Sequence, residues 1–305
     1  MSLHDEVALG MSLPHRSPDP IPVSVVRAVA QRADELGFQD LWVTNNTVDV
    51  IGNFDSLTVL TYAAALTTRI RLGVSVMVLP TYHPVHVAHV VATLDQLSGG
   101  RATLGVGLGR VEEYALFQVP VERRVRRFTE ALELIRALWA QDEVTYEGEM
   151  YTADGASLGI RPVQEPPPIW LGSFHPDALR RAARIGDGWM GAGGSGTAAF
   201  AHAVPLLRDA LAAEGRDAAT FPISKRVFLS VHDDAATARA EVERWFATAY
   251  RNPALTDQAG VFGTPEEVGA QLHALVEAGA THLLLNPVTR YEEQLEALAE
   301  ITGLA

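Results

Sequence analysis

The sequence predicts a closed (β/α)8 barrel, an α/β fold in which eight parallel strands alternate with helices. Short β-rich runs alternate with amphipathic helical stretches from one end of the chain to the other. Eight such runs can be distinguished, which is the strand number of this barrel. No composition shift and no linker rich in serine and proline divides the 305 residues. We therefore expect a single domain over residues 1–305.

The first half of the chain contains four strand–helix units. The predicted strands are 7–13, 41–44, 70–76 and 102–106, and the helices that follow them are 23–36, 56–66, 85–97 and 122–139. Gly37 follows the first helix, and Gly99-Gly100 follows the third. Glycine commonly ends helices because it adopts the left-handed conformation without strain.

In the second half, one segment interrupts this alternation. Residues 144–151 predict a β-hairpin that turns at Glu147-Gly148, inside an insertion of about residues 142–167 between the fourth helix and the fifth strand. Strands are then expected at 169–171, 188–191, 223–231 and 282–285, with helices at 178–185, 198–213 and 235–250. Thr264-Pro265-Glu266-Glu267 has the N-cap, proline and acidic residues of a further helix start.

A doubly wound open sheet is the alternative fold. Gly191 to Gly196 satisfies the spacing G-x-G-x-x-G between a strand and a helix, and Asp233 follows the next strand. The motif comes late in a chain whose regular units begin at residue 7, so we favour the barrel. In a barrel, the backbone N–H groups of these glycines would form an anion pocket at the start of the helix after the sixth strand.

Composition restricts the classes of partner. The formal net charge is −13, which argues against nucleic acid and membrane surfaces, because both require concentrated positive charge. No apolar run approaches the roughly 20 residues of a membrane span, and the N-terminus lacks the pattern of a signal peptide. The absence of cysteine removes disulfides, thiolate metal sites and cysteine nucleophiles. We expect a cytoplasmic protein that acts on a small molecule.

In a barrel, the active site lies at the carboxyl ends of the strands, so position alone selects candidate residues. The selected residues are His15, Asn45, Asn46, Ser75, Val76, Met77, Tyr82, His83, Gly107, Gly109, Arg110, Glu113, Tyr114, Gly172, Ser173 and the run Gly191 to Ser195. Glycines, small hydroxyls and apolar side chains dominate this set. They suit a large planar cofactor with a phosphate better than direct catalysis by side chains.

Two hydrolase mechanisms fit these residues less well. Glycoside hydrolysis needs paired carboxylates, and no strand ends directly in Asp or Glu. A metal-dependent barrel hydrolase would need His83 and His86 as ligands. His83, His86 and His89 are spaced by three residues, so a helix rotates them progressively around its axis, and we predict no metal site.

Taken in order, the segments 69–84, 93–101, 104–109 and 179–189 resemble the luciferase-like monooxygenase superfamily, whose members use a flavin or a deazaflavin. The resemblance extends to 264–267 and 283–285. It implies a barrel oxidoreductase that binds coenzyme F420 or FMN at the strand ends, and it is compatible with a homodimer. We favour F420 and hydride transfer to or from a small organic substrate. An FMN-dependent monooxygenase that uses reduced flavin and oxygen is the alternative.

The resemblance also suggests positions for the cofactor. In deazaflavin-dependent relatives the third strand ends in a bulge with a non-prolyl cis peptide behind the ring, and Ser75-Val76, followed by Met77, matches it. Gly105, Gly107 and Gly109 would lie beneath the cofactor's side chain, with barrel packing as the other explanation. The segments that hold the phosphate in relatives correspond to Gly172 and Ser173, and to Ala192, Gly193, Gly194 and Ser195. Ser173 replaces the glycine that is usual there.

One position departs from the pattern of the relatives. Many deazaflavin dehydrogenases and reductases have an Asp-His or Glu-His pair after the second strand, where this chain has Asn45-Asn46. An amide forms hydrogen bonds but is no general base at neutral pH, which disfavours alcohol oxidation that depends on proton abstraction there. His83, Glu113 and Tyr114 are the replacement candidates. A non-catalytic flavin-binding protein would also explain the missing pair.

Overall fold

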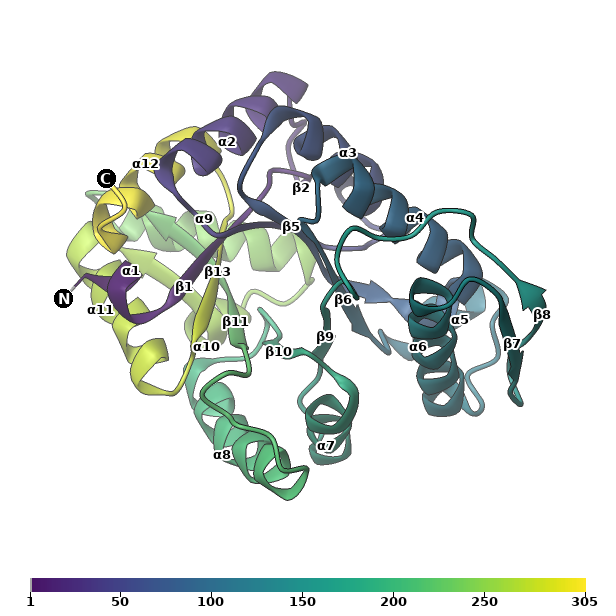
Figure 1. The fold of residues 1–305 in the computed structure, drawn as a ribbon. Coiled ribbons are helices and arrows are strands. Elements are labelled where there is room, and N and C mark those ends of the chain that lie inside the picture. Colours follow the sequence, from purple (N-terminus) through teal and green to yellow (C-terminus); the bar gives the residue numbers. More distant parts are fainter. Residues whose placement is uncertain (1) are drawn as a thin grey trace.

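The computed structural model describes residues 2–305, so Met1, the first residue of the expected domain, lies outside the described residues. The structure contains the predicted barrel (Figure 1). Eight parallel strands pair in the circular order β1-β3-β5-β6-β9-β10-β11-β13, and β13 pairs with β1 to close the circle. The doubly wound alternative is therefore wrong. The strands are β1 (Ala8–Ser12), β3 (Asp40–Val43), β5 (Arg71–Val78), β6 (Ala102–Gly107), β9 (Ile169–Gly172), β10 (Gly188–Gly191), β11 (Ile223–Val231) and β13 (His282–Pro287).

Helices surround the strands, as Figure 1 shows. The predicted ones are α2 (Val23–Leu36), α3 (Ser56–Leu66), α4 (Pro84–Ser98), α6 (Arg124–Ala140), α7 (Pro176–Ile185), α8 (Thr197–Ala213), α9 (Ala235–Ala249) and α11 (Pro265–Glu277). The predicted bounds of α2 and α3 are the same as the observed bounds. The glycine signals are confirmed, because Gly37 and Gly99 end α2 and α4 at φ angles of 91° and 70°.

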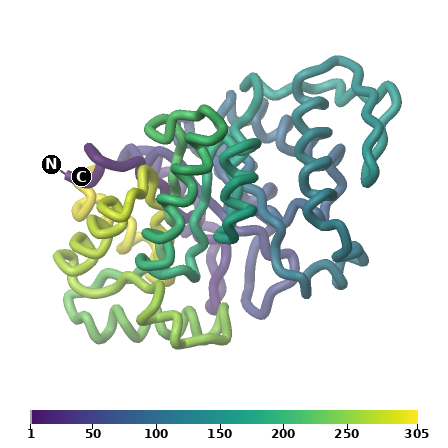
Figure 2. The backbone as a smooth tube through the Cα atoms, turned by 90° about the horizontal axis from the view of Figure 1, so that it is seen from below, coloured from purple at the N-terminus to yellow at the C-terminus, as the bar shows by residue number. Residues whose placement is uncertain are grey.

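Several short elements were not predicted. They are α1 (Leu3–Glu6), the ribbon of β2 (Arg16–Ser17) and β4 (Gly52–Asn53), the 3-10 turn η1 (Leu79–Thr81), α5 (Val111–Leu116), α10 (Leu255–Ala259) and β12 (Gly260–Gly263). The terminal helix α12 (Tyr291–Thr302) was also not predicted. The backbone carbonyl of Thr302 lies 3.4 Å from Nδ1 of His4, and the two ends of the chain lie side by side in Figures 1 and 2.

The insertion contains a hairpin, β7 (Val144–Glu147) and β8 (Thr152–Ala156). Its turn is longer than the predicted turn at Glu147-Gly148 and includes residues 148–151. The carboxylate of Glu130, buried on α6, accepts hydrogen bonds from the backbone N–H groups of Glu149, Met150 and Tyr151. Those N–H groups are therefore not available to a strand ladder, and the second strand begins later than expected.

Large aromatic side chains fill the inside of the barrel. The rings of Trp42 and Trp170 lie 5.2 Å apart. A Cβ atom on Gly73 would lie 2.2 Å from the Trp42 ring, and one on Gly188 would lie 2.8 Å from the Trp170 ring. Small residues on some strands thus make room for large ones on others, which is how such barrels pack their interior.

The amino-terminal end of the barrel holds a buried polar network. His282 Nε2 lies 3.0 Å from Oδ1 of Asp40, and His282 Nδ1 lies 2.7 Å from Oγ of Ser224. The indole N–H of Trp42 also donates to Asp40. Polar side chains at this depth are stable because each has a hydrogen-bond partner.

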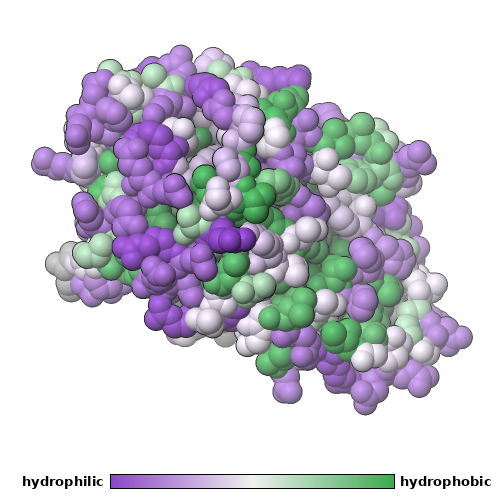
Figure 3. All heavy atoms as spheres, turned by 90° about the horizontal axis from the view of Figure 1, so that it is seen from above, coloured by the Kyte–Doolittle hydropathy of each residue, from purple (hydrophilic) through white to green (hydrophobic). Residues whose placement is uncertain are grey.

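Polar and apolar side chains are mixed on the face of the molecule seen in Figure 3. In the described part of the chain, no helix is both long and apolar enough to cross a membrane.

Candidate active site

A cavity of about 520 Å³ opens at the carboxyl ends of the barrel strands. Its walls come from the ends of β3, β5 and β6, from Arg226 on β11, from Arg16 after β1, and from residues 249–251 at the end of α9. The size lies within the range of roughly 300–1,000 Å³ that is typical of small-molecule sites. Val48 and Val50 add an apolar border and are 58% and 54% exposed. The position and size are those of a barrel active site.

A bulge in β5 forms one wall of the cavity. The pairing of β5 with β6 shifts register between Val74 and Met77, and the Ser75-Val76 peptide bond is cis, as the resemblance implied. Consecutive residues of a regular strand point to opposite faces. Here Ser75 and Val76 both line the cavity, because the bulge turns two neighbouring residues to the same side.

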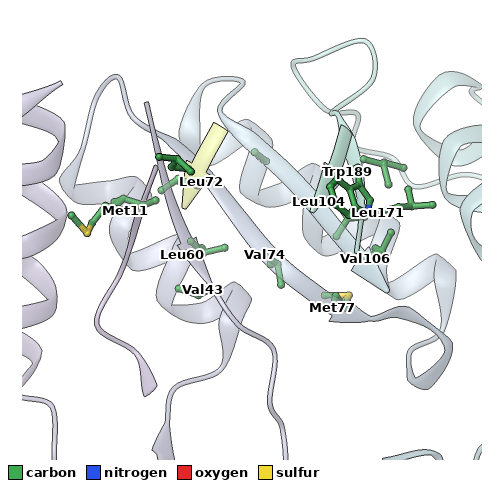
Figure 4. Packing of buried hydrophobic residues seen from close by; sticks show 14 of the residues in the cluster. Met11, Val43, Leu60, Leu72, Val74, Met77, Leu104, Val106, Leu171 and Trp189 are labelled. Carbon is green, nitrogen blue, oxygen red and sulfur yellow. The ribbon is translucent and has the colours of Figure 1, made fainter. Parts of the chain in front are cut away.

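Met77 has a different environment from its two neighbours. Its side chain is 1% exposed and belongs to the hydrophobic core outside the barrel interior. Figure 4 shows it on β5 among other core side chains, including Val74 and Val106. The side chain of Met77 therefore does not line the cavity, and a role for it in cofactor binding stays a prediction.

The glycines of β6 and β9 pack against β5. A Cβ atom on Gly107 would lie 2.8 Å from Cγ2 of Val76, and one on Gly172 would lie 2.9 Å from its Cγ1. Gly109, at φ +65°, approaches the side chain of Val78 in the same way. Their immediate function is to hold Val76 and Val78 in place. This is the barrel-packing explanation of these glycines, and it also fixes the wall that the cavity presents.

The asparagines after β3 both line the cavity and are half-buried. Nδ2 of Asn45 donates to Oη of Tyr82 at 2.9 Å, and Nδ2 of Asn46 donates to Oγ1 of Thr44 at 2.7 Å. Thr44 in turn contacts His15, because its backbone N–H donates to His15 Nε2 at 2.8 Å. Burial lowers the pKa of His15 to about 3, so the ring is neutral at physiological pH. This side of the cavity is a neutral hydrogen-bonding surface.

Two carboxylates line the cavity, and each is paired with an arginine. Asp49 accepts from Nε of Arg16 at 2.5 Å, and Oε1 of Glu113 accepts from Nε of Arg110 at 3.1 Å. The second oxygen of Glu113, Oε2, is buried and has no hydrogen-bond partner between residues 2 and 305. Of the three replacement candidates, Glu113 thus lies at the cavity with an unused acceptor.

The other two replacement candidates lie outside the cavity lining. His83 is exposed and caps α4, where its Nδ1 accepts from the N–H of Val85 at 3.3 Å. Its ring meets Tyr151 of the hairpin turn edge-on, with 5.7 Å between centroids. Tyr114 is fully buried and donates from Oη to the carbonyl of Leu108 at 2.6 Å. Both side chains have structural contacts that explain their positions.

The predicted phosphate segments lie at the ends of β9 and β10, and none of their residues is among those that line the main cavity. Oγ of Ser173 is buried and unpartnered within the described range. The loop of Ala192, Gly193, Gly194 and Ser195 leads into α8, and Nζ of Lys225 donates to the carbonyl of Ala192 at 2.9 Å. A Cβ atom on Gly193 would lie 2.4 Å from the ring of Phe228. Ser195 lines a second cavity of about 400 Å³.

Sequence reasoning selected Arg110 but missed the other three arginines of the site. Four arginines line the main cavity, namely Arg16, Arg110, Arg226 and Arg251, against the two carboxylates. The pair Lys225-Arg226 inside an otherwise apolar strand was the signal that could have identified one of them. Tyr250 and Arg251 reach the cavity only through the fold, because they follow a helix and not a strand.

The residues present fit a phosphorylated planar cofactor. Ser173 Oγ is a buried polar atom that lacks a partner in the described structure, and Ser75 and Val76 form one wall of the cavity. The cavity carries two more positive than negative side chains in a chain of net charge −13. Among residues 2–305, no three His, Asp or Glu side chains are grouped so that they could hold a metal ion.

The model of the luciferase-like monooxygenase family matches residues 7–282. An F420-dependent glucose-6-phosphate dehydrogenase of Kineococcus radiotolerans is 32% identical over 84% of this chain and 85% of its own. A 5,10-methylenetetrahydromethanopterin reductase of Archaeoglobus fulgidus is 31% identical over 81% of this chain and 72% of its own.

Solved structures have the same architecture. A monooxygenase from Streptomyces bottropensis superposes with a TM-score of 0.83 at 25% identity, over 96% of this chain and 98% of its own. An F420-dependent secondary alcohol dehydrogenase, bound to an F420-acetone adduct, superposes with a TM-score of 0.86 over 98% and 99% of the two chains. Its sequence identity is 20%, so that likeness concerns the fold.

Proposed function

The chain belongs to the luciferase-like monooxygenase family, and from this premise we propose that it is an oxidoreductase that uses coenzyme F420 for hydride transfer to or from a small organic substrate. The observation that carries the proposal is the cavity itself. It lies at the strand ends, has Ser75 and Val76 on its wall, and has an excess of arginine over carboxylate that suits an anionic cofactor. The F420-dependent relative at 32% identity favours the deazaflavin over FMN.

The residues have separate functions in this proposal. When bound, the deazaflavin supplies a ring carbon that accepts or donates hydride. Ser75 and Val76 support one face of the ring, and the segments at Ser173 and Gly193 hold the phosphate. Asn45 and Asn46 orient bound molecules through hydrogen bonds. Glu113 is the candidate for holding a proton, at the Oε2 atom that has no partner within residues 2–305.

Cofactor titration tests the proposal directly. Val76 packs in one cluster with Trp42 and Trp170, so a ring bound on Val76 is expected to change tryptophan fluorescence. We expect saturation by F420 at micromolar concentration or below, with weaker binding of FMN. Turnover with reduced F420 and a panel of electron acceptors would follow. If neither cofactor binds, the proposal is wrong.

An FMN-dependent monooxygenase is the second candidate. It is favoured by the structural likeness to the Streptomyces bottropensis monooxygenase at 25% identity. Tighter binding of FMN than of F420, together with oxygen consumption by the reduced flavin complex, would select it. The homodimer and the cytoplasmic location expected from the sequence stay predictions.

A further inference from the structure

Arg226 is a buried cation at the floor of the cavity. It lies on β11, with its side chain toward the inside of the barrel, and it is 7% exposed. Its guanidinium carbon lies 6.0 Å from the centre of the Phe228 ring. The side chain thus has lost almost all of its hydration while keeping one side open to the cavity.

The guanidinium of Arg226 has buried donors without an acceptor in the described chain. Nε and Nη2 of Arg226 are buried and have no hydrogen-bond partner among residues 2–305, and the two carboxylates that line the cavity pair with Arg16 and Arg110 instead. Burial lowers the pKa of Arg226 to about 10, which still leaves it charged at neutral pH. A buried charge without a partner is strongly unfavourable, so a charged Arg226 at this position indicates a ligand that accepts hydrogen bonds from its guanidinium.

The other arginines of the cavity are either paired with a carboxylate or exposed to solvent. Arg16 is bound by Asp49, and Arg110 is bound by Glu113. Arg251 is exposed to solvent, which hydrates its charge. Arg226 is therefore the cation of the cavity with both low exposure and free donors.

We propose that Arg226 binds a carboxylate or phosphate group of the substrate, so that this enzyme acts on small organic acids. The planar guanidinium offers two parallel N–H donors, which match the two oxygens of such a group. The assignment of the anion to the substrate rests on the proposed function, because it presupposes a cofactor ring on Ser75 and Val76.

The order of the strands in the barrel indicates that the anionic group bound by Arg226 belongs to the substrate and not to the cofactor. In the circle β1-β3-β5-β6-β9-β10-β11-β13, β5 and β11 are four strands apart, which places them opposite each other. A ring lying on the β5 bulge would therefore turn its free face toward Arg226. That face is where a substrate must lie for hydride transfer. Gly193 is nonetheless close, since a Cβ atom there would lie 2.9 Å from Cδ of Arg226, so the test must separate the two sources.

The experiment compares Arg226→Gln, Arg226→Lys and the control Arg251→Gln, which removes the same charge from the exposed border of the cavity. Benzoate is the probe, inorganic phosphate is a second one, and uncharged benzamide is the reference for shape. Binding is measured by calorimetry with the full-length protein, with and without F420. A circular dichroism spectrum checks that each variant is folded.

We expect wild-type protein to bind benzoate at least tenfold more tightly than benzamide. Arg226→Gln should abolish that preference, Arg226→Lys should keep part of it, and Arg251→Gln should change it less than threefold. F420 affinity should change less than threefold in Arg226→Gln. This pattern would support an anion site that serves the substrate.

Two results would overturn the proposal. One is a preference for benzoate that survives in Arg226→Gln. The other is a tenfold or larger loss of F420 affinity in Arg226→Gln, which would assign the arginine to the cofactor's own anionic groups. Failure of the proposed function looks different. Wild-type protein would then bind neither F420 nor FMN, while any benzoate binding that depends on Arg226 would still support the anion site.

Discussion

Ser224 and Arg226 lie two residues apart on β11 and both face the inside of the barrel, but their surroundings are opposite. Ser224 belongs to the network at the amino-terminal end, where His282 and Asp40 complete one another's hydrogen bonds. Arg226, one step toward the carboxyl end, has donors without partners in the described chain. Buried polar groups that stabilise a fold are satisfied by the protein itself, whereas those that bind are left to be satisfied by a ligand.

The largest expected effect is on stability, and it comes from the buried polar network at the amino-terminal end of the barrel. Asp40→Ala would leave the ring N–H of His282 and the indole N–H of Trp42 buried without an acceptor. We expect a loss of about 3–5 kcal/mol in the free energy of unfolding, measured by urea denaturation. Asp209→Ala, at an exposed position on α8, should change it by less than about 0.5 kcal/mol. A small effect of Asp40→Ala would mean that the network does not stabilise the barrel.

His15 sharpens the comparison, because it is buried at the cavity end and yet satisfied by Leu13 and Thr44. Burial lowers its pKa from 6.5 to about 3. Between these values the unfolded chain binds a proton that the folded one does not, so stability falls as pH falls. The expected slope is about 1.4 kcal/mol per pH unit, or about 2 kcal/mol at pH 5.

Denaturation curves between pH 7 and pH 4.5 measure this contribution. His15→Gln should remove about one proton from the pH dependence of the unfolding free energy. His89→Gln, on the exposed side of α4, is the control and should leave that dependence close to wild type. Identical curves for His15→Gln and wild type would contradict the assignment of a neutral buried ring.

The wall opposite Arg226 is the next target. Gly107→Ala would bring a methyl group within 2.8 Å of Cγ2 of Val76. We expect a loss of about 1–2 kcal/mol in stability together with weaker F420 binding, because the β5 wall must shift. Gly269→Ala, where a Cβ atom would lie 3.5 Å from Ile301, should be neutral or stabilising. Unchanged cofactor affinity in Gly107→Ala would separate these glycines from the binding site.

The smallest effect has the opposite sign. Arg226→Met removes a buried charge that has no partner in the described structure and replaces it with an apolar side chain of similar length. The ligand-free protein should gain about 1 kcal/mol in stability, measured as a higher denaturation midpoint. A clear loss of stability would show that Arg226 contributes to the fold in the way that the Asp40 network does.

Much of this architecture was predictable, because apolar strand runs and helix-end signals are local properties. The eight strands, and the ends at Gly37 and Gly99, follow from residues close in sequence. The site was less predictable, since the sequence of β11 does not say which of Lys225 and Arg226 faces the cavity. Nor could it say that residues 148–151 would stay a loop, because Glu130 holds them from another element.

The attachment of the hairpin through Glu130 has a consequence for engineering. One buried carboxylate on α6 binds three successive N–H groups of the turn, and these bonds depend on the backbone and not on the side chains. The turn is therefore an exchangeable part, which can take up new side chains while its anchor stays the same. Libraries that vary residues 149–151 and keep Glu130 and Gly148 would sample new surfaces beside His83 without rebuilding the barrel.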